Sequence, residues 1–418
     1  MTHTANPPQR AVEPPPDRSV PRLALVLTGG GARAAYQVGL LRWLGRRVPE
    51  LRFDIITGVS AGAINACYLA SHAGDLAFAA TGLTDVWAGL EPERVFRVDT
   101  RSLLSRTAGW GLRLVSGGAP IAPKPQSLVD ASPLSTLLRD TLEADEGGQL
   151  TGITRNIAAG RLRAIALTTL DWATGVNVTW VQDHDVAAWS RPGRESRLAT
   201  LTLDHVLASA SLPMIFPAVR LDGSWHGDGG VRLTFPLAPA LHLGADRILA
   251  ISTRHAPQGG RRSADTDGYP PPAQIAGVLF NAVFLDALDS DAHTLQRLNR
   301  LLPTATAETR RALRPIELCV IRPSTDLGRL AAKFEWRLPG AFRFMTRGLG
   351  TKQTRSPDLL SLLLFQRDYV EALMEIGEQD AEVHGEELLA IVAGRPATPT
   401  SDADARSRES PSADAHSR

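Results

Sequence analysis

The sequence has few cysteines and almost no excess charge. Its 418 residues include two cysteines, too few for a disulfide framework, which favours a reducing compartment. The formal net charge is +1, so no bulk field attracts nucleic acid, and we expect no nucleic-acid partner. With 43% hydrophobic and 21% charged residues, the composition is that of a globular protein large enough to bury a sizeable core.

Long hydrophobic runs are also absent. No apolar stretch reaches the roughly 18 to 20 residues that a membrane span needs. Residues 1–21 are rich in proline and polar side chains and lack the apolar core of a secretory signal. We expect residues 1–21 and 395–418 to be disordered. The protein itself is expected to be cytoplasmic or peripherally bound to a membrane.

Between these ends, strand-like and helix-like segments alternate. Short apolar runs predict strands at 23–27, 53–57, 163–169, 176–181, 247–252 and 315–321. Helical spacing predicts helices between them, and two later ones at 274–298 and 357–377. Strands separated by helices predict an α/β fold with a mostly parallel central sheet covered on both faces.

Three glycines, Gly29–Gly31, lie between the first predicted strand and a predicted helix. Because glycine has no Cβ, the backbone can turn sharply and bring its N–H groups close to a ligand. The N-terminus of the following helix favours negative charge, and Arg33 adds a cation. The loop therefore suits an anion, either a phosphate or a developing oxyanion.

A nucleotide site is one alternative for this loop. Gly29-x-Gly31-x-x-Ala34 matches the dinucleotide-binding pattern G-x-G-x-x-G/A. That pattern also expects an acidic residue near the end of the next strand, about 20 residues on. Asp54 lies at the start of that strand instead. A glycine turn that binds no ligand is the other alternative.

A second motif, Gly58-Val59-Ser60-Ala61-Gly62, matches the nucleophile pattern G-x-S-x-G. It follows a predicted strand and precedes a helix of small residues. A sharp strand-to-helix turn projects the serine hydroxyl outward, and only small neighbours tolerate the crowding. The context therefore predicts that Ser60 is a nucleophile.

A serine nucleophile needs a base. The segment Asp228-Gly229-Gly230 offers a carboxylate, although an aspartate beside two glycines is more often a simple turn. Upstream of it lies the segment 208–217, which reads ASASLPMIFP. The chain order of the glycine loop, the Ser60 motif, segment 208–217 and the Asp228 turn suggests what Asp228 does.

Taken in order, the Gly29–Gly31 loop, the Gly58–Gly62 elbow, segment 208–217 and the Asp228–Gly230 turn resemble the patatin-like phospholipase family. The resemblance extends from about residue 23 to residue 252. The family's loop usually carries glycine where this chain has Ala34, which leaves the amide donors unchanged.

The resemblance implies a fold, a site and a reaction. The fold is a three-layer α/β/α catalytic domain at 22–255, with a mostly helical C-terminal extension at 256–394 packed on it. Ser60 is the nucleophile and Asp228 the base of a dyad without histidine. The amides of Gly29, Gly30 and Gly31, aided by Arg33, form the oxyanion hole. The implied activity is hydrolysis of a lipid or lysolipid ester without a cofactor.

A histidine-dependent esterase is a further alternative. An α/β-hydrolase would use serine, aspartate and histidine in that chain order, and His255 completes the order. In that fold several strands precede the elbow, whereas here one or two do. His226 is expected to be structural, and no residue spacing resembles a metal site. Asp286, Asp289, Asp291 and His293 are expected to form a solvated helix face.

One segment is compatible with a lipid surface. Residues 333–347, KFEWRLPGAFRFMTR, interleave basic and aromatic residues, as interfacial segments do. Trp336 and Phe344 would then contact the membrane. An ordinary loop that packs its aromatic side chains inward is an equal alternative, and the sequence leaves the oligomeric state open.

Overall fold

The computed structural model describes residues 21–97, 127–183, 185–255, 271–284, 286–338 and 358–395, with a few isolated positions at 108–116, 340 and 343. Apart from residues 21 and 395, the two ends expected to be disordered lie outside these residues, as does Phe344. No described helix combines the length and apolar character needed to cross a membrane. Trp336, within the segment expected to contact lipid, is 60% exposed. Lipid contact there stays a prediction.

The strands build one mixed sheet. They are β1 (Leu23–Leu27), β2 (Ile55–Val59), β3 (Ala164–Asp171), β4 (Asn177–Gln182), β5 (Ser190–Arg191), β6 (Arg194–Leu198), β7 (Val219–Leu221), β8 (Ser224–Asp228), β9 (Arg247–Ile251) and β10 (Glu317–Ile321). Their order is β10-β9-β1-β2-β3-β4-β6-β5, and β8 pairs with β3 and β7 off this path. The five strands from β10 to β3 are parallel. This confirms the mostly parallel sheet.

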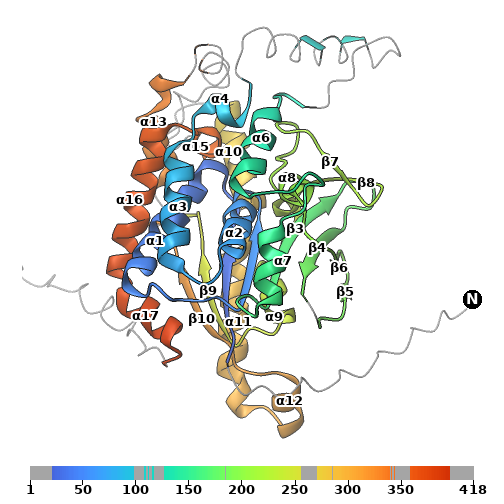
Figure 1. Ribbon diagram of the computed structural model, residues 1–418, viewed down its shortest axis with the longest axis vertical. Coiled ribbons are helices and arrows are strands. Elements are labelled where there is room, and N and C mark those ends of the chain that lie inside the picture. Colours follow the sequence, from blue (N-terminus) through green and yellow to red (C-terminus); the bar gives the residue numbers. More distant parts are fainter. Residues whose placement is uncertain are drawn as a thin grey trace, which may run out of the picture.

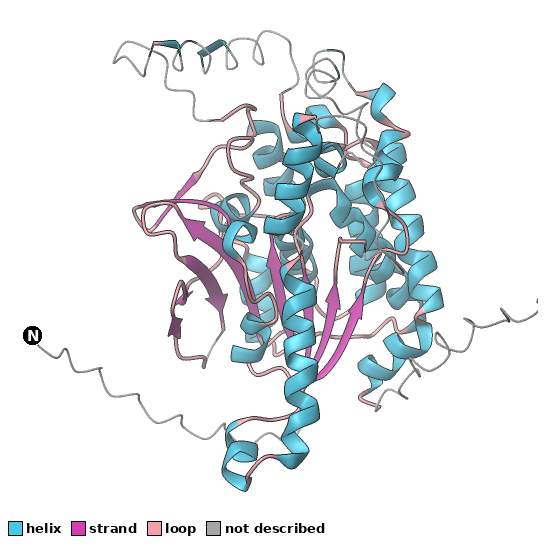
Figure 2. Ribbon diagram, turned by 180° about the vertical axis from the view of Figure 1, so that it is seen from behind, coloured by secondary structure: helices cyan, strands magenta, loops and turns pink. Residues whose placement is uncertain are grey.

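Helices cover both faces of the sheet (Figures 1 and 2). The longer ones are α1 (Ala35–Arg47), α2 (Ala61–Ser71), α3 (Leu76–Ala88), α6 (Ser132–Thr141), α7 (Thr151–Ala158), α10 (Pro272–Phe284), α11 (Ala287–Leu301), α16 (Arg367–Val383) and α17 (Gly385–Ala393). The shorter ones are α4 (Pro92–Val95), α8 (Leu203–Ser209), α9 (Ala238–His242), α12 (Ala307–Ala312), α13 (Leu327–Ala332) and α15 (Asp358–Leu363). 3₁₀ turns include η1 (Gly31–Ala34), η2 (Gly229–Arg232) and η4 (Glu335–Arg337).

The sheet separates two hydrophobic cores. The larger core joins one face of the sheet to α1, α2, α3 and α16. The smaller core joins the other face to α9 and α11. Strands β1 and β2 are buried along their whole length, which explains why they read as continuous apolar runs rather than alternating ones. The three-layer α/β/α arrangement expected from the sequence is confirmed.

Several element boundaries differ from the sequence prediction. The strand predicted at 53–57 lies at 55–59, so Gly58 and Val59 belong to β2. Ser60 is then the single residue between β2 and the helix α2. The single helices expected at 274–298 and 357–377 are each two helices. Helix α7 and strands β5 and β6 were not predicted, because short segments with few apolar residues carry little periodic signal.

The solvated face predicted at 286–293 is only partly correct, because His293 is exposed but Asp289 and Asp291 bind neighbouring segments. Asp289 binds both Arg254 and Arg322, with oxygen-to-nitrogen distances of 2.5 and 2.7 Å. Asp291 accepts a hydrogen bond from the backbone N–H of Leu237 at 2.9 Å. These carboxylates therefore tie α11 to the segments around it, a role that a local charge pattern does not reveal.

Helices α1 and α16 pack closely enough to require glycine in both. A Cβ added at Gly39 would overlap the carbonyl of Met374. In the same way, a Cβ at Gly377 would overlap the carbonyl of Tyr36. Because backbone atoms meet backbone atoms here, no side-chain rotation can relieve such an overlap. This contact fixes the C-terminal helices against the helix that follows the glycine loop.

We predict that Gly377→Ala separates α1 from α16 and destabilises the protein by about 1–3 kcal/mol, despite the better helix propensity of alanine. Urea denaturation measures the effect. Val383→Ala is the matched control, since Val383 lies in the same helix and is 81% exposed. Equal stability of Gly377→Ala and wild type would contradict the close packing.

Candidate active site

One edge of strand β3 brings the two predicted catalytic residues together. Strand β2 pairs with the first half of this edge and ends at Val59, opposite Thr168. Strand β8 then pairs with the second half, and Asp228 lies opposite Thr169. Ser60 follows Val59 directly, so the serine and the aspartate reach the same place from two strands. The junction of β2 and β8 along β3 is the structural basis of the site.

Ser60 has the strained backbone expected of a nucleophile elbow. Its φ of 57° and ψ of −134° lie in a region that a residue with a side chain rarely adopts. The flanking glycines make this turn possible, because a Cβ at Gly58 would lie 2.6 Å from the Gly62 carbonyl and one at Gly62 would overlap the Leu27 carbonyl. Ser60 is 3% exposed and immediately precedes α2.

The elbow is supported by a residue whose role the sequence did not reveal. The backbone N–H of Ser60 donates to the Ser209 Oγ at 3.0 Å. Ser209 Oγ in turn donates to the carbonyl of Thr168 at 2.8 Å. Ser209 belongs to segment 208–217, so the motif was visible although its function was not. It links the elbow, α8 and β3 by hydrogen bonds.

Asp228 is fully buried at the end of β8. Its Oδ1 accepts a hydrogen bond from the Gly230 N–H at 2.8 Å. Burial raises the pKa of the carboxyl group from 3.8 to about 7, although the Ser60 hydroxyl and the Gly230 N–H oppose this rise. Within the described chain Oδ2 accepts no hydrogen bond with full geometry. The Ser60 hydroxyl is thus near enough to favour the ionised carboxylate, while Oδ2 keeps a free lone pair for a proton.

The glycine loop passes beside Ser60. A Cβ at Gly29 would lie 2.8 Å from the Cβ of Ser60, so only glycine fits. Gly30 and Gly31 have φ angles of 150° and 54°, which glycine adopts readily. No described residue accepts a hydrogen bond from the N–H of Gly30 or Gly31. The loop thus holds unpaired donors next to the serine.

Arg33 points to another partner. Its guanidinium donates to Ser361 Oγ at 2.6 Å and to Asp358 Oδ1 at 2.6 Å. Arg33 is only 3% exposed. Its positive charge is therefore taken up by α15, and neither Asp358 nor Ser361 was singled out from the sequence, because no local motif marks them.

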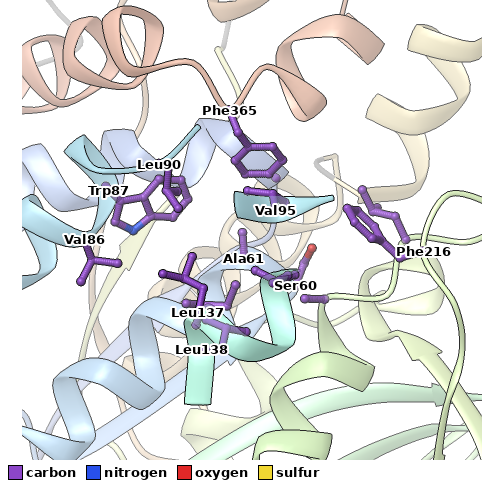
Figure 3. Close-up of a pocket in the computed structure, with 15 residues that line it drawn as sticks. Ser60, Ala61, Val86, Trp87, Leu90, Val95, Leu137, Leu138, Phe216 and Phe365 are labelled. Carbon is purple, nitrogen blue, oxygen red and sulfur yellow. The ribbon is translucent and has the colours of Figure 1, made fainter. Parts of the chain in front are cut away.

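An apolar cavity opens next to Ser60 (Figure 3). Ser60 and Ala61 lie at one side of it, and Phe216 lies beside Ser60. Phe365, from the segment after α15, lies across the cavity from Leu137 and Leu138 of α6. The remaining labelled side chains, Val86, Trp87, Leu90 and Val95, are apolar as well. Such a lining suits a hydrocarbon chain.

His226 and His255 hydrogen-bond to groups other than Ser60 and Asp228. His226 is fully buried, and its Nδ1 shares a hydrogen bond with Thr169 Oγ1 at 3.0 Å. Burial lowers its pKa, as expected of a neutral structural histidine. His255 Nδ1 binds the carbonyl of Pro323 at 2.9 Å. In the described part of the chain, no group of three or more potential ligand side chains could hold a metal ion.

Comparison with known proteins identifies the family. A patatin-like phospholipase model matches residues 25–241, just over half of the chain. The chain belongs to the patatin-like phospholipase family. The matched segment contains the glycine loop, Ser60 and Asp228, and it ends well before α15. No curated protein matches the chain.

Solved structures in the same comparison share low sequence identity with this patatin-like protein. VipD from Legionella pneumophila is 12% identical over 85% of this chain and 67% of its own, with a TM-score of 0.33. Human GIVD cytosolic phospholipase A2 is 12% identical over 90% and 60%, with a TM-score of 0.43. ExoU from Pseudomonas aeruginosa is 16% identical over 92% and 83%, with a TM-score of 0.27. The chain spans about three fifths of the human enzyme.

The buried carboxyl group makes a testable prediction about stability. Between pH 3.8 and about 7 the unfolded chain releases the Asp228 proton while the folded protein keeps it, so stability is lost as the pH rises through this range. Asp228→Asn removes this loss. We expect its thermal midpoint to exceed that of wild type at about pH 8, and the gain to shrink towards about pH 4.

Asp171→Asn is the control of opposite sign. Burial opposes ionisation of Asp171, but hydrogen bonds from the Ala173 N–H and from Thr174 favour the ionised form, and the pKa of this carboxyl group is lowered. Its ionised form stabilises the fold above the ordinary pKa, so this variant should lose stability at about pH 8. A fall in midpoint for Asp228→Asn at that pH would refute the raised pKa.

Proposed function

We propose that this patatin-like protein is a lipid acyl hydrolase that cleaves carboxylic esters through an acyl-enzyme on Ser60. The observation that carries the proposal is the meeting of Ser60, Asp228 and the free amides of the glycine loop beside one apolar cavity. Family membership supports lipid hydrolysis in general. The assignment of the dyad rests on the geometry.

In the acylation step, Asp228 accepts the Ser60 proton while Ser60 Oγ attacks the acyl carbonyl carbon. The carbonyl oxygen becomes an oxyanion, and the N–H groups of Gly30 and Gly31 donate to it. When the tetrahedral intermediate collapses, the ester bond breaks and the alcohol leaves with the proton from Asp228. A carboxylate with a pKa of about 7 suits this task, because it is ionised near neutral pH and still basic enough to take a proton.

In the deacylation step, water replaces the alcohol. Asp228 accepts a proton from the water as the water oxygen attacks the acyl carbon, and the same loop amides hold the second oxyanion. Collapse breaks the bond to Ser60 Oγ, which regains a proton from Asp228. The free carboxylic acid leaves, and the site returns to its starting state without a cofactor.

The proposed substrate is an ester with a long acyl chain. The cavity beside Ser60 offers leucine, valine and aromatic side chains, which stabilise a hydrocarbon chain by burial. Phospholipids, lysophospholipids and neutral glycerides all present such a chain. The cavity therefore supports a substrate with a long acyl chain.

Two other functions receive less support. For a dinucleotide site, the acidic residue should bind ribose, but Asp54 accepts a hydrogen bond from the Leu23 N–H at 2.8 Å, at the start of β1 and away from the loop. For a histidine-dependent esterase, His255 should bind Asp228, but its Nδ1 binds the carbonyl of Pro323.

Ser60→Ala tests the nucleophile. We expect it to lose at least about 10⁴-fold in kcat and to abolish labelling by a fluorophosphonate probe. A panel of phospholipid, lysophospholipid and glyceride substrates measures hydrolysis, and His255→Ala is the matched variant that should keep activity. Labelling or hydrolysis by Ser60→Ala at the wild-type rate would exclude Ser60, whereas a tight NAD complex without labelling would support the nucleotide alternative.

The pH dependence of hydrolysis tests the base. Because Asp228 must be ionised to accept a proton, kcat/KM should rise about tenfold per pH unit below about 7 and level off above it. Asp228→Asn should lose about 10²–10⁴-fold in kcat. A profile that is already flat at about pH 5 would mean that a group of ordinary carboxyl pKa, or none, acts as the base.

A further inference from the structure

Helix α15 contacts the glycine loop from outside the part of the chain that matches the family. It comprises Asp358–Leu363, whereas the family match ends at residue 241. The two backbones touch, because a Cβ added at Gly31 would overlap the carbonyl of Leu362. Phe365, two residues beyond the helix, lines the cavity beside Ser60. One short segment thus touches both the loop and the cavity.

The side chain of Arg33 joins the loop to this helix. Its Nε donates to Ser361 Oγ at 2.6 Å, and its Nη2 donates to the carboxylate and the carbonyl of Asp358 at 2.6 and 3.3 Å. Ser361 Oγ donates in turn to the Asp358 carbonyl at 2.6 Å. Hydrogen bonds between charged groups are among the strongest in proteins, and removing one partner of a buried pair is costly.

The backbone of Arg33 acts on the loop as well. Its N–H donates to the carbonyl of Gly30 at 3.0 Å, which closes the turn that presents the free amides. From the other side, Thr253 Oγ1 donates to the carbonyl of Gly29 at 2.5 Å. The loop is therefore held at Gly29 by Thr253, two residues after β9, and at Arg33 by α15. The unpaired N–H groups of Gly30 and Gly31 lie between these two supports.

We propose that α15 is a positioning element that holds the oxyanion loop in register with Ser60, and that Asp358 and Ser361 are positioning residues that act through Arg33. The proposal rests on the proposed hydrolase function. It also changes the part expected of Arg33, which supports the amide donors instead of facing the oxyanion. A small shift of the donors is enough to matter, because misplacement by about 1 Å can cost about 10²-fold in rate.

A purely structural tether between the C-terminal helices and the domain would share the same contacts. A second ion pair provides the control for that alternative. Arg42 Nε of α1 donates to Glu378 Oε2 of α16 at 2.9 Å, so it also ties the C-terminal helices to the domain. This pair touches neither the loop nor the cavity. Glu378→Gln therefore loosens the same interface without reaching the oxyanion loop.

Hydrogen exchange of the full-length protein tests the clamp without relying on activity. In Asp358→Asn and Ser361→Ala, the hydrogen-bonded amides within residues 29–34, including that of Arg33, should exchange at least about tenfold faster than in wild type, because local opening becomes easier. In Glu378→Gln they should exchange at the wild-type rate. Unchanged exchange at 29–34 in Asp358→Asn would overturn the proposal, even if the protein hydrolysed no ester.

Kinetics then test the catalytic consequence. Asp358→Asn should lower kcat by about 10–10²-fold with little change in KM, because the donors matter mainly in the transition state. Arg33→Gln should lower kcat similarly, and the double variant no further, since both act through one contact. Wild-type kcat in Asp358→Asn, or additive losses in the double variant, would overturn the positioning role. Loss of the proposed function itself would appear separately, as hydrolysis that survives Ser60→Ala.

Discussion

The site depends on the pairing of two strands along one edge of β3. Strand β2 pairs with β3 up to Val59, which lies opposite Thr168, and β8 pairs antiparallel with the next part of the same edge. Asp228 therefore lies opposite Thr169, the next residue of β3. A shift of β8 by one residue would turn the carboxylate to the other face of the sheet. The buried position of Asp228 next to the turn at Ser60 follows from this junction, so the register of β8 decides whether the carboxylate can reach the serine.

This arrangement is unfavourable for stability, and other contacts offset the loss. Ser60 has a strained backbone, Asp228 is buried with a raised pKa, and the glycine loop leaves amides unpaired. Such features persist only where the surroundings over-determine them. Ser209 bridges the elbow to β3, and the close backbone contact of α1 with α16 braces the helix that follows the loop. The two hydrophobic cores on either side of the sheet provide the remaining support.

Short sequence patterns predicted the strands and the serine of the candidate site. The contacts that bring its residues together join positions far apart in the chain, and such patterns do not show them. Buried strands and the G-x-S-x-G elbow carry their own patterns, so the sheet and Ser60 could be predicted from short windows of sequence. The partner of Arg33 lies 325 positions away in the chain and has no motif. For the same reason, Phe365 could not be assigned to the cavity, and the carboxylates of α11 looked solvated. Short helices and edge strands such as α7 and β5 lacked enough periodicity to be seen.

The C-terminal part of the chain takes part in the site and in the sheet. Strand β10 extends the parallel sheet beyond β9, and α16 packs against α1 across a backbone contact. Helix α15 packs against α13 and α10, and α16 begins four residues after it ends, so neighbouring elements fix its position over the loop. A helix of six residues has little stability of its own. The contact of α15 with Arg33 is therefore stabilised by the packing of the larger elements around this helix. The geometry beside Ser60 then depends on the folding of residues that lie beyond the family match.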